Sequence, residues 1–128
     1  MAIDVIKFIT HLRRTALPRY GEGICATHIR ESLEVGGGNT KGHPIHAKQY
    51  GPTLKRNGYR IVPKVTEEFG LLRLGDIAVI EPPSHGKISG HIQAWEGRIW
   101  ISDFLQNDFW PGKSYREEQP DYAIYRYL

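Results

Sequence analysis

The stretch from residue 88 to residue 103 constrains the fold most, because it alternates with the period of a β-strand on both sides of a turn. Residues 91–95 and 98–103 each alternate in side-chain character, and Glu96-Gly97 lies between them. The pattern predicts a β-hairpin. His91 opens its first strand and Asp103 closes its second, so we expect the two side chains to lie side by side at one edge of a sheet.

Helical patterns come before the strands. Apolar residues recur at helical spacing in three segments, the first ended by Pro18, the second by three glycines and the third interrupted by Gly51-Pro52. The first segment is residues 2–16, the second has Cys25 in its first turn and ends at the glycines of residues 36–38, and the third is about residues 46–57. Further strands are predicted at residues 74–80 and 122–127, and residues 59–62 are predicted to form a short strand or a connector. Helices followed by strands predict an α+β fold, with N-terminal helices packed on a small antiparallel sheet in a single domain spanning residues 1–128.

Composition excludes several classes of protein. The 128 residues are 40% hydrophobic and 24% charged, which is ordinary for a globular domain, and no apolar run is long enough to span a bilayer. Asp4 and the lack of a small-residue cleavage site near it predict no secretory signal, so we expect synthesis in the cytoplasm. The single cysteine excludes an internal disulfide. The net charge of +3 is mild and does not predict nucleic-acid binding.

That single cysteine, Cys25, is a candidate nucleophile. It follows Gly21 and Gly23 and is expected in the first turn of the second helix, where the helix dipole and unpaired backbone amides favour a thiolate. A nearby imidazole would favour it further, and the Cys25 amide would point at the oxyanion of a tetrahedral intermediate. A lone cysteine is more often a small buried hydrophobe, so the hypothesis depends on the ordered set of cysteine, His91 and Asp103.

Over residues 21–103 this ordered pattern resembles the papain-like amidases of the CHAP and NlpC type. Gly75-Asp76 and Gly90-His91 at the openings of two strands match the habit of that family. The resemblance implies that Cys25 is the nucleophile, that His91 is the general base, and that Asp103 orients the imidazole. It also implies a papain-like fold, and hydrolysis of amide bonds in bacterial peptidoglycan without a cofactor.

As a small single domain without a predicted signal sequence, the chain resembles two kinds of member of this superfamily. These are the antibacterial amidase effectors that secretion machines deliver between bacteria, and phage-type lysins. The resemblance therefore implies export by a dedicated machine or by lysis, action at the periplasm or cell wall, and an immunity protein as inhibitor.

Other polar residues could contact the substrate or bind a metal ion. His85 precedes His91 in a loop, and we expect His85, Gln93 and Gln106 to border the substrate. His43 and His46 have no spaced thiol beside them, which makes a poor metal site, and we predict none.

Two other functions remain open from the sequence. A non-catalytic module that binds an anionic polymer such as nucleic acid or glycan would suit the basic charge balance and the aromatic C-terminal region. A cysteine acyltransferase would use the same thioester step as a hydrolase, and the sequence cannot separate the two.

Overall fold

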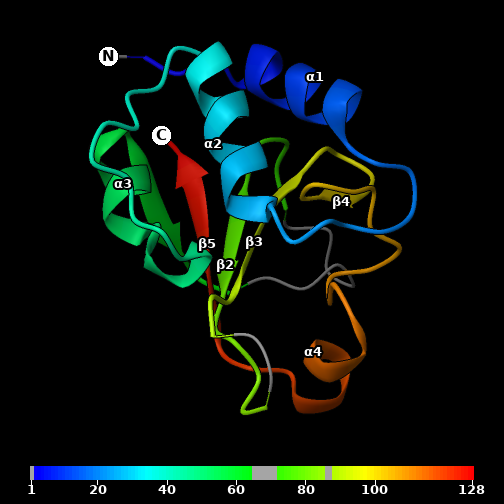
Figure 1. Cartoon of the computed structure of the whole chain (residues 1–128). Helices are drawn as coiled ribbons and strands as arrows, with labels where there is room; N and C mark the ends of the chain where they lie inside the picture. Colours follow the sequence, from blue (N-terminus) through cyan, green and yellow to red (C-terminus); the bar gives the residue numbers. More distant parts are fainter. Residues whose placement is uncertain (1, 65–71, 86–87) are drawn as a thin grey trace.

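The computed structural model describes residues 2–64, 72–85 and 88–128. Two helices, α1 (Val5–Thr15) and α2 (Cys25–Val35), pack against each other and cover one face of a five-stranded sheet (Figure 1). The strands are β1 (Tyr59–Val62), β2 (Ile77–Ile80), β3 (His91–Trp95), β4 (Trp100–Ile101) and β5 (Tyr122–Tyr127), and they lie in the order β1-β5-β2-β3-β4. All four strand pairs are antiparallel, which confirms the predicted fold class.

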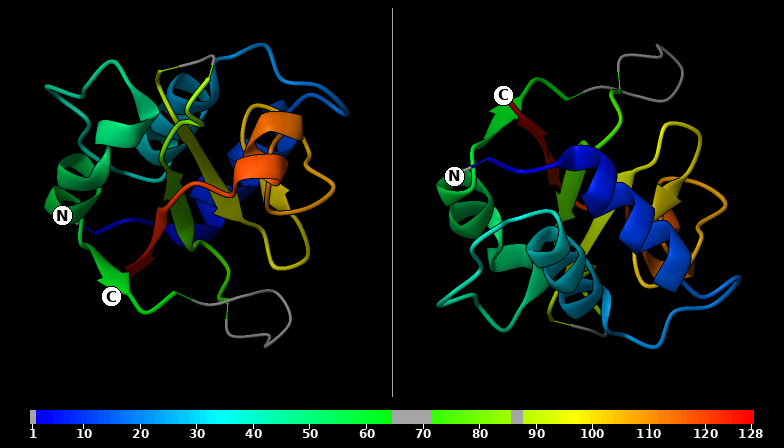
Figure 2. Two further views of the ribbon diagram at one scale, coloured as in Figure 1. Left: turned by 90° about the horizontal axis from the view of Figure 1, so that it is seen from below. Right: turned by 90° about the horizontal axis from the view of Figure 1, so that it is seen from above.

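The first face of the sheet carries the main core. Phe8 and Leu12 of α1 and Ile29 and Leu33 of α2 are fully buried, together with the strand residues that alternate toward them. The two helices cross this face in the view from above (Figure 2, right). Asp4 caps α1 through the amide of Lys7, and Gly36 ends α2, as the glycine run predicts.

The second face carries a smaller aromatic cluster. Ala78, Ile80, Trp100 and Ile124 are buried there against rings from the chain after β4. This part of the chain includes a short helix, α4 (Lys113–Glu118), in a region that the sequence pattern predicts to be irregular. Seen from below, α4 lies beside β3 and β4 (Figure 2, left).

The predicted third helix is divided. A 3-10 turn, η1 (Ala47–Gln49), is followed by α3 (Gly51–Arg56), and Pro52 at the start of α3 explains the break because proline has no amide to continue the turn. Lys48 N donates to Ser89 O, which ties this segment to the chain just before β3. In the part of the chain that the structure describes, no helix is long and apolar enough to cross a membrane.

Candidate active site

Cys25 is the first residue of α2, and its side chain is half-buried. The chain reaches it through a tight loop in which Gly23 has a left-handed φ of 80°, a conformation that glycine adopts without a steric cost. The backbone of Ile92, in β3, hydrogen-bonds to the thiol, so the thiol lies beside this strand. The fold therefore brings the expected nucleophile next to the strand that begins with His91.

The short fourth strand explains how a thiol reaches the edge of β3. Trp95 pairs with Trp100 and Ala94 with Ile101, and β4 ends there, so the first half of β3 has no strand partner on that side among the residues that the structure describes. A backbone group of Ile92 is then free to meet the thiol rather than another strand. Cys25 therefore lies at a gap in the sheet edge.

The environment of the thiol favours its neutral form. Burial raises the pKa of Cys25, the Asp103 carboxylate raises it further, and hydrogen bonds from the backbone of Ile92, Ala26 and Cys25 itself only partly oppose this. The expectation from the helix dipole was a favoured thiolate, and burial outweighs it. A nucleophile of this kind needs a base that removes its proton as it attacks.

His91 has the tautomer that such a base requires. The residue is 7% exposed, and its Nε2 lies 2.9 Å from Oε1 of Gln106. The side-chain amide of Gln106 donates from Nε2 to Gln93 Oε1 at 2.8 Å and to the Asp108 carbonyl at 3.1 Å. Because the carbonyl can only accept, the Gln106 oxygen must face the imidazole, and His91 Nε2 must carry the proton. His91 Nδ1 is then the basic nitrogen.

The sequence predicts that Asp103 contacts the His91 imidazole. In the structure, Gln106 is the residue that contacts Nε2 of this imidazole. Trp95 pairs with Trp100 in an antiparallel register. The same register, continued along the two strands, places Asp103 opposite Ile92 and not opposite His91. The Asp103 carboxylate accepts hydrogen bonds from the backbone amides of Glu22 at 2.6 Å and Ile24 at 3.3 Å. It therefore holds the loop that leads into Cys25.

This loop fits closely against Asp103. A Cβ atom at Gly21 would lie 2.5 Å from Asp103 Oδ1, so only glycine leaves room for the carboxylate there. Leu17 N also donates to the Asp103 carbonyl at 2.8 Å. The aspartate and the loop position Cys25 together.

We expect Asp103→Ala to destabilise the protein by about 1.5–3 kcal/mol, because two backbone amides lose a charged and buried acceptor. Chemical denaturation measures the change. Asp121→Ala is the matched control, since its carboxylate is exposed in an ion pair with Lys64 and its loss should not measurably change stability. Equal denaturation midpoints for Asp103→Ala and Asp121→Ala would contradict the role given to Asp103.

The remaining predicted residues lie in different surroundings. Gln93 and Gln106 are buried and bond to each other, so both lie behind the imidazole and not at the surface where a substrate would bind. His85 is exposed and lies near Glu118 of α4. His46 bonds to Ser89 through Nδ1 at 2.7 Å, and His43 stacks on Tyr50. In residues 2–64, 72–85 and 88–128 no group of three or more candidate metal ligands comes together.

Tyr115 of α4 belongs to the site although no sequence pattern indicated it. Its ring centroid lies 5.9 Å from that of His91, with the planes tilted by 59°. Its hydroxyl also interacts electrostatically with Cys25. A tyrosine in a short polar segment gives no periodic signal, so only the tertiary structure brings it to the site.

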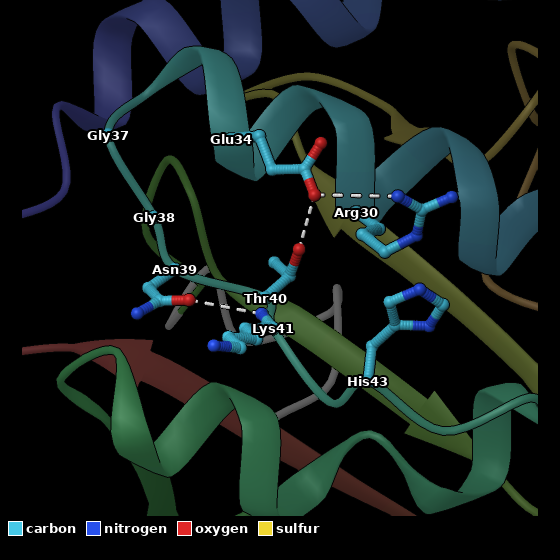
Figure 3. A pocket seen from close by; sticks show the side chains of 8 residues that line it. All are labelled: Arg30, Glu34, Gly37, Gly38, Asn39, Thr40, Lys41 and His43. Carbon is cyan, nitrogen blue, oxygen red and sulfur yellow. Dashed lines mark hydrogen bonds and ion pairs between the residues drawn. The ribbon is translucent and has the colours of Figure 1, made fainter.

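A separate pocket lies at the far end of α2, lined by eight residues between the helix and the loop that follows it (Figure 3). Glu34 accepts from Thr40 and pairs with Arg30 at 3.4 Å, so the charges of Glu34 and Arg30 neutralise each other. Glu34 is nine residues from Cys25, or about 13 Å along the helix axis. None of the predicted site residues lines this pocket.

The arrangement can carry out nucleophilic acyl chemistry. It supplies a thiol, an imidazole whose Nε2 contacts Gln106, and the backbone amides of a helix N-terminus that can stabilise a negative oxygen.

No protein-family model and no curated protein sequence matches the chain. Solved structures do match it. The type VI native effector-immunity complex Tae3-Tai3 from Ralstonia pickettii contains a chain that is 31% identical, with a TM-score of 0.83, and the match covers 98% of this chain and 99% of that one. The selenomethionine form of the same complex gives 32% identity, a TM-score of 0.80, and coverage of 94% and 99%. At this identity over nearly the whole of both chains, the protein belongs to the Tae3 family of type VI effectors.

Proposed function

We propose that the protein is a cysteine amidase that hydrolyses amide bonds in bacterial peptidoglycan. The observation that carries the proposal is the position of Cys25, at the start of α2 and against the backbone of Ile92, which directly follows His91, whose Nε2 contacts Gln106. Membership of an effector family, together with the resemblance to papain-like wall amidases, supports the choice of substrate.

The roles follow from the geometry. As Cys25 Sγ attacks the amide carbon, its proton passes to His91 Nδ1, the C=O π pair moves to oxygen, and a tetrahedral intermediate forms. The intermediate collapses, the C–N bond breaks, and the leaving amine takes the proton from His91. A water molecule then gives a proton to His91 and attacks the thioester, releasing a carboxylic acid and the free thiol. Gln106 keeps the imidazole in the required tautomer throughout.

The effector family also supports a partner and a place of action. The relative from Ralstonia pickettii was solved with its immunity protein Tai3. We propose that an immunity protein likewise inhibits this chain, and that type VI delivery brings the chain to the periplasm, where peptidoglycan is exposed.

The test is digestion of purified Gram-negative peptidoglycan in water enriched in oxygen-18, with the soluble fragments read by mass spectrometry. We expect new fragments, each with a free amine at the cut and one heavy oxygen in the new carboxylate, because water resolves the thioester. Cut peptide joined to an added amine, without heavy oxygen, would identify an acyltransferase instead. A folded wild-type protein that releases nothing would contradict the amidase proposal.

A further inference from the structure

Tyr115 lies on the short helix α4. Six residues make a helix too short to be stable by itself, so its position depends on tertiary contacts. Arg116 pairs with both carboxylate oxygens of Asp108 at 3.2 Å. Glu118 accepts from the backbone amide of Ser84 at 3.1 Å and from its hydroxyl at 2.5 Å. These contacts fix α4 at both sides of Tyr115.

The fixed helix places the Tyr115 side chain at the reaction centre. The ring packs on His91, at 5.9 Å between centroids, and the side chain is half-buried. No hydrogen-bond partner of its hydroxyl is found among residues 2–64, 72–85 and 88–128, although that hydroxyl interacts electrostatically with Cys25. A half-buried hydroxyl near the thiol is thus available to a bound molecule.

The hydroxyl is a donor under working conditions. Burial, and secondly the nearby Cys25 thiol, raise the pKa of Tyr115 to about 12, so it stays protonated at neutral pH. It can donate a hydrogen bond to a developing negative charge without becoming charged itself.

We propose that the Tyr115 hydroxyl donates a hydrogen bond to the oxyanion that forms when Cys25 attacks the substrate amide. The oxyanion oxygen is bonded to the carbon that the sulfur attacks, so a donor close to the thiol is close to that oxygen as well. The new S–C bond takes its electron pair from the thiolate, and the C=O π pair comes to rest on oxygen between Tyr115 and the Cys25 amide. No proton leaves Tyr115. This inference rests on the proposed amidase function.

The test is Tyr115→Phe, which keeps the ring on His91 and removes only the hydroxyl. We expect kcat on peptidoglycan to fall about 10- to 100-fold with KM nearly unchanged. This loss is smaller than the roughly 10²- to 10³-fold known for removal of one oxyanion donor, because the Cys25 amide remains. Tyr122→Phe is the matched control, since Tyr122 packs on Phe109 and Trp110 in the aromatic cluster, and its activity should equal that of the wild type.

A second measurement distinguishes a Tyr115 hydroxyl that donates to the oxyanion from one that only supports the structure of the site. Alkylation of Cys25 by iodoacetamide forms no oxyanion, so its rate in Tyr115→Phe should match that of the wild type. Unchanged kcat, a rise in KM alone, or slower alkylation in proportion to lost activity would each overturn the inference while leaving the amidase proposal intact. An inactive wild type would overturn both.

Discussion

Cys25→Ala is expected to reduce the hydrolysis of peptidoglycan by at least about 10⁴-fold, because the variant has no atom that can form the thioester. The chain has no second cysteine that could replace it. Cys25→Ser should be nearly as inactive, since a hydroxyl holds its proton far more tightly than a thiol and His91 would have to remove it completely. Release of soluble fragments, followed over time, measures the effect.

The matched control for this variant is Glu34→Gln, which changes the same helix at its other end. Glu34 lines the separate pocket of Figure 3 and pairs with Arg30 and Thr40, away from the thiol. Its variant should keep full activity. Activity retained in Cys25→Ala, with the fold intact, would remove the cysteine from the mechanism.

The pH dependence of alkylation tests the resting state of the same thiol. Burial and the Asp103 carboxylate raise the pKa of Cys25, so the thiolate should be scarce at pH 7 and should increase as the pH rises above the ordinary cysteine range. Iodoacetamide should therefore react more slowly with Cys25 than with a free cysteine peptide, and its rate should climb through alkaline pH. A fast rate that is flat between pH 6 and 8 would indicate a preformed thiolate–imidazolium pair instead.

Local patterns were enough to predict most of the fold. The strand from Tyr122 to Tyr127 has the predicted bounds, and the second helix has Cys25 in its first turn and ends at the glycine run as predicted, because each is marked by its own periodicity and ending residues. The helix α4 was missed, since tertiary pairs such as Arg116 with Asp108 hold it in place and its sequence contains no apolar repeat.

The site was less accessible to sequence reasoning than the fold. Cys25 and His91 stand at the first residue of a helix and of a strand, and glycines nearby made both visible. The partner of the imidazole was not visible, because Gln106 lies after the end of β4 and reaches His91 only through a turn in which Leu105 returns to Ile101. The contact between His91 and Gln106 depends on where the two-residue strand β4 ends, and no local sequence pattern predicts that end.

Gln106 gives the second large effect. Gln106→Met keeps the length and volume of the side chain but removes the oxygen that accepts the His91 Nε2 proton. The imidazole can then place its proton on either nitrogen, and molecules with the proton on Nδ1 cannot act as a base toward Cys25. We expect kcat to fall about 10²- to 10³-fold, less than the roughly 10⁴-fold loss known for a histidine that is forced into the wrong tautomer.

Asp103→Asn provides the comparison that decides between the two candidate orienting residues. Its side-chain oxygen can still accept from Glu22 or Ile24, so the loop before Cys25 should be retained in part, and kcat should fall less than in Gln106→Met. If Asp103→Asn loses more activity than Gln106→Met at equal stability, Asp103 and not Gln106 orients the imidazole, and the tautomer argument from the amide network is wrong.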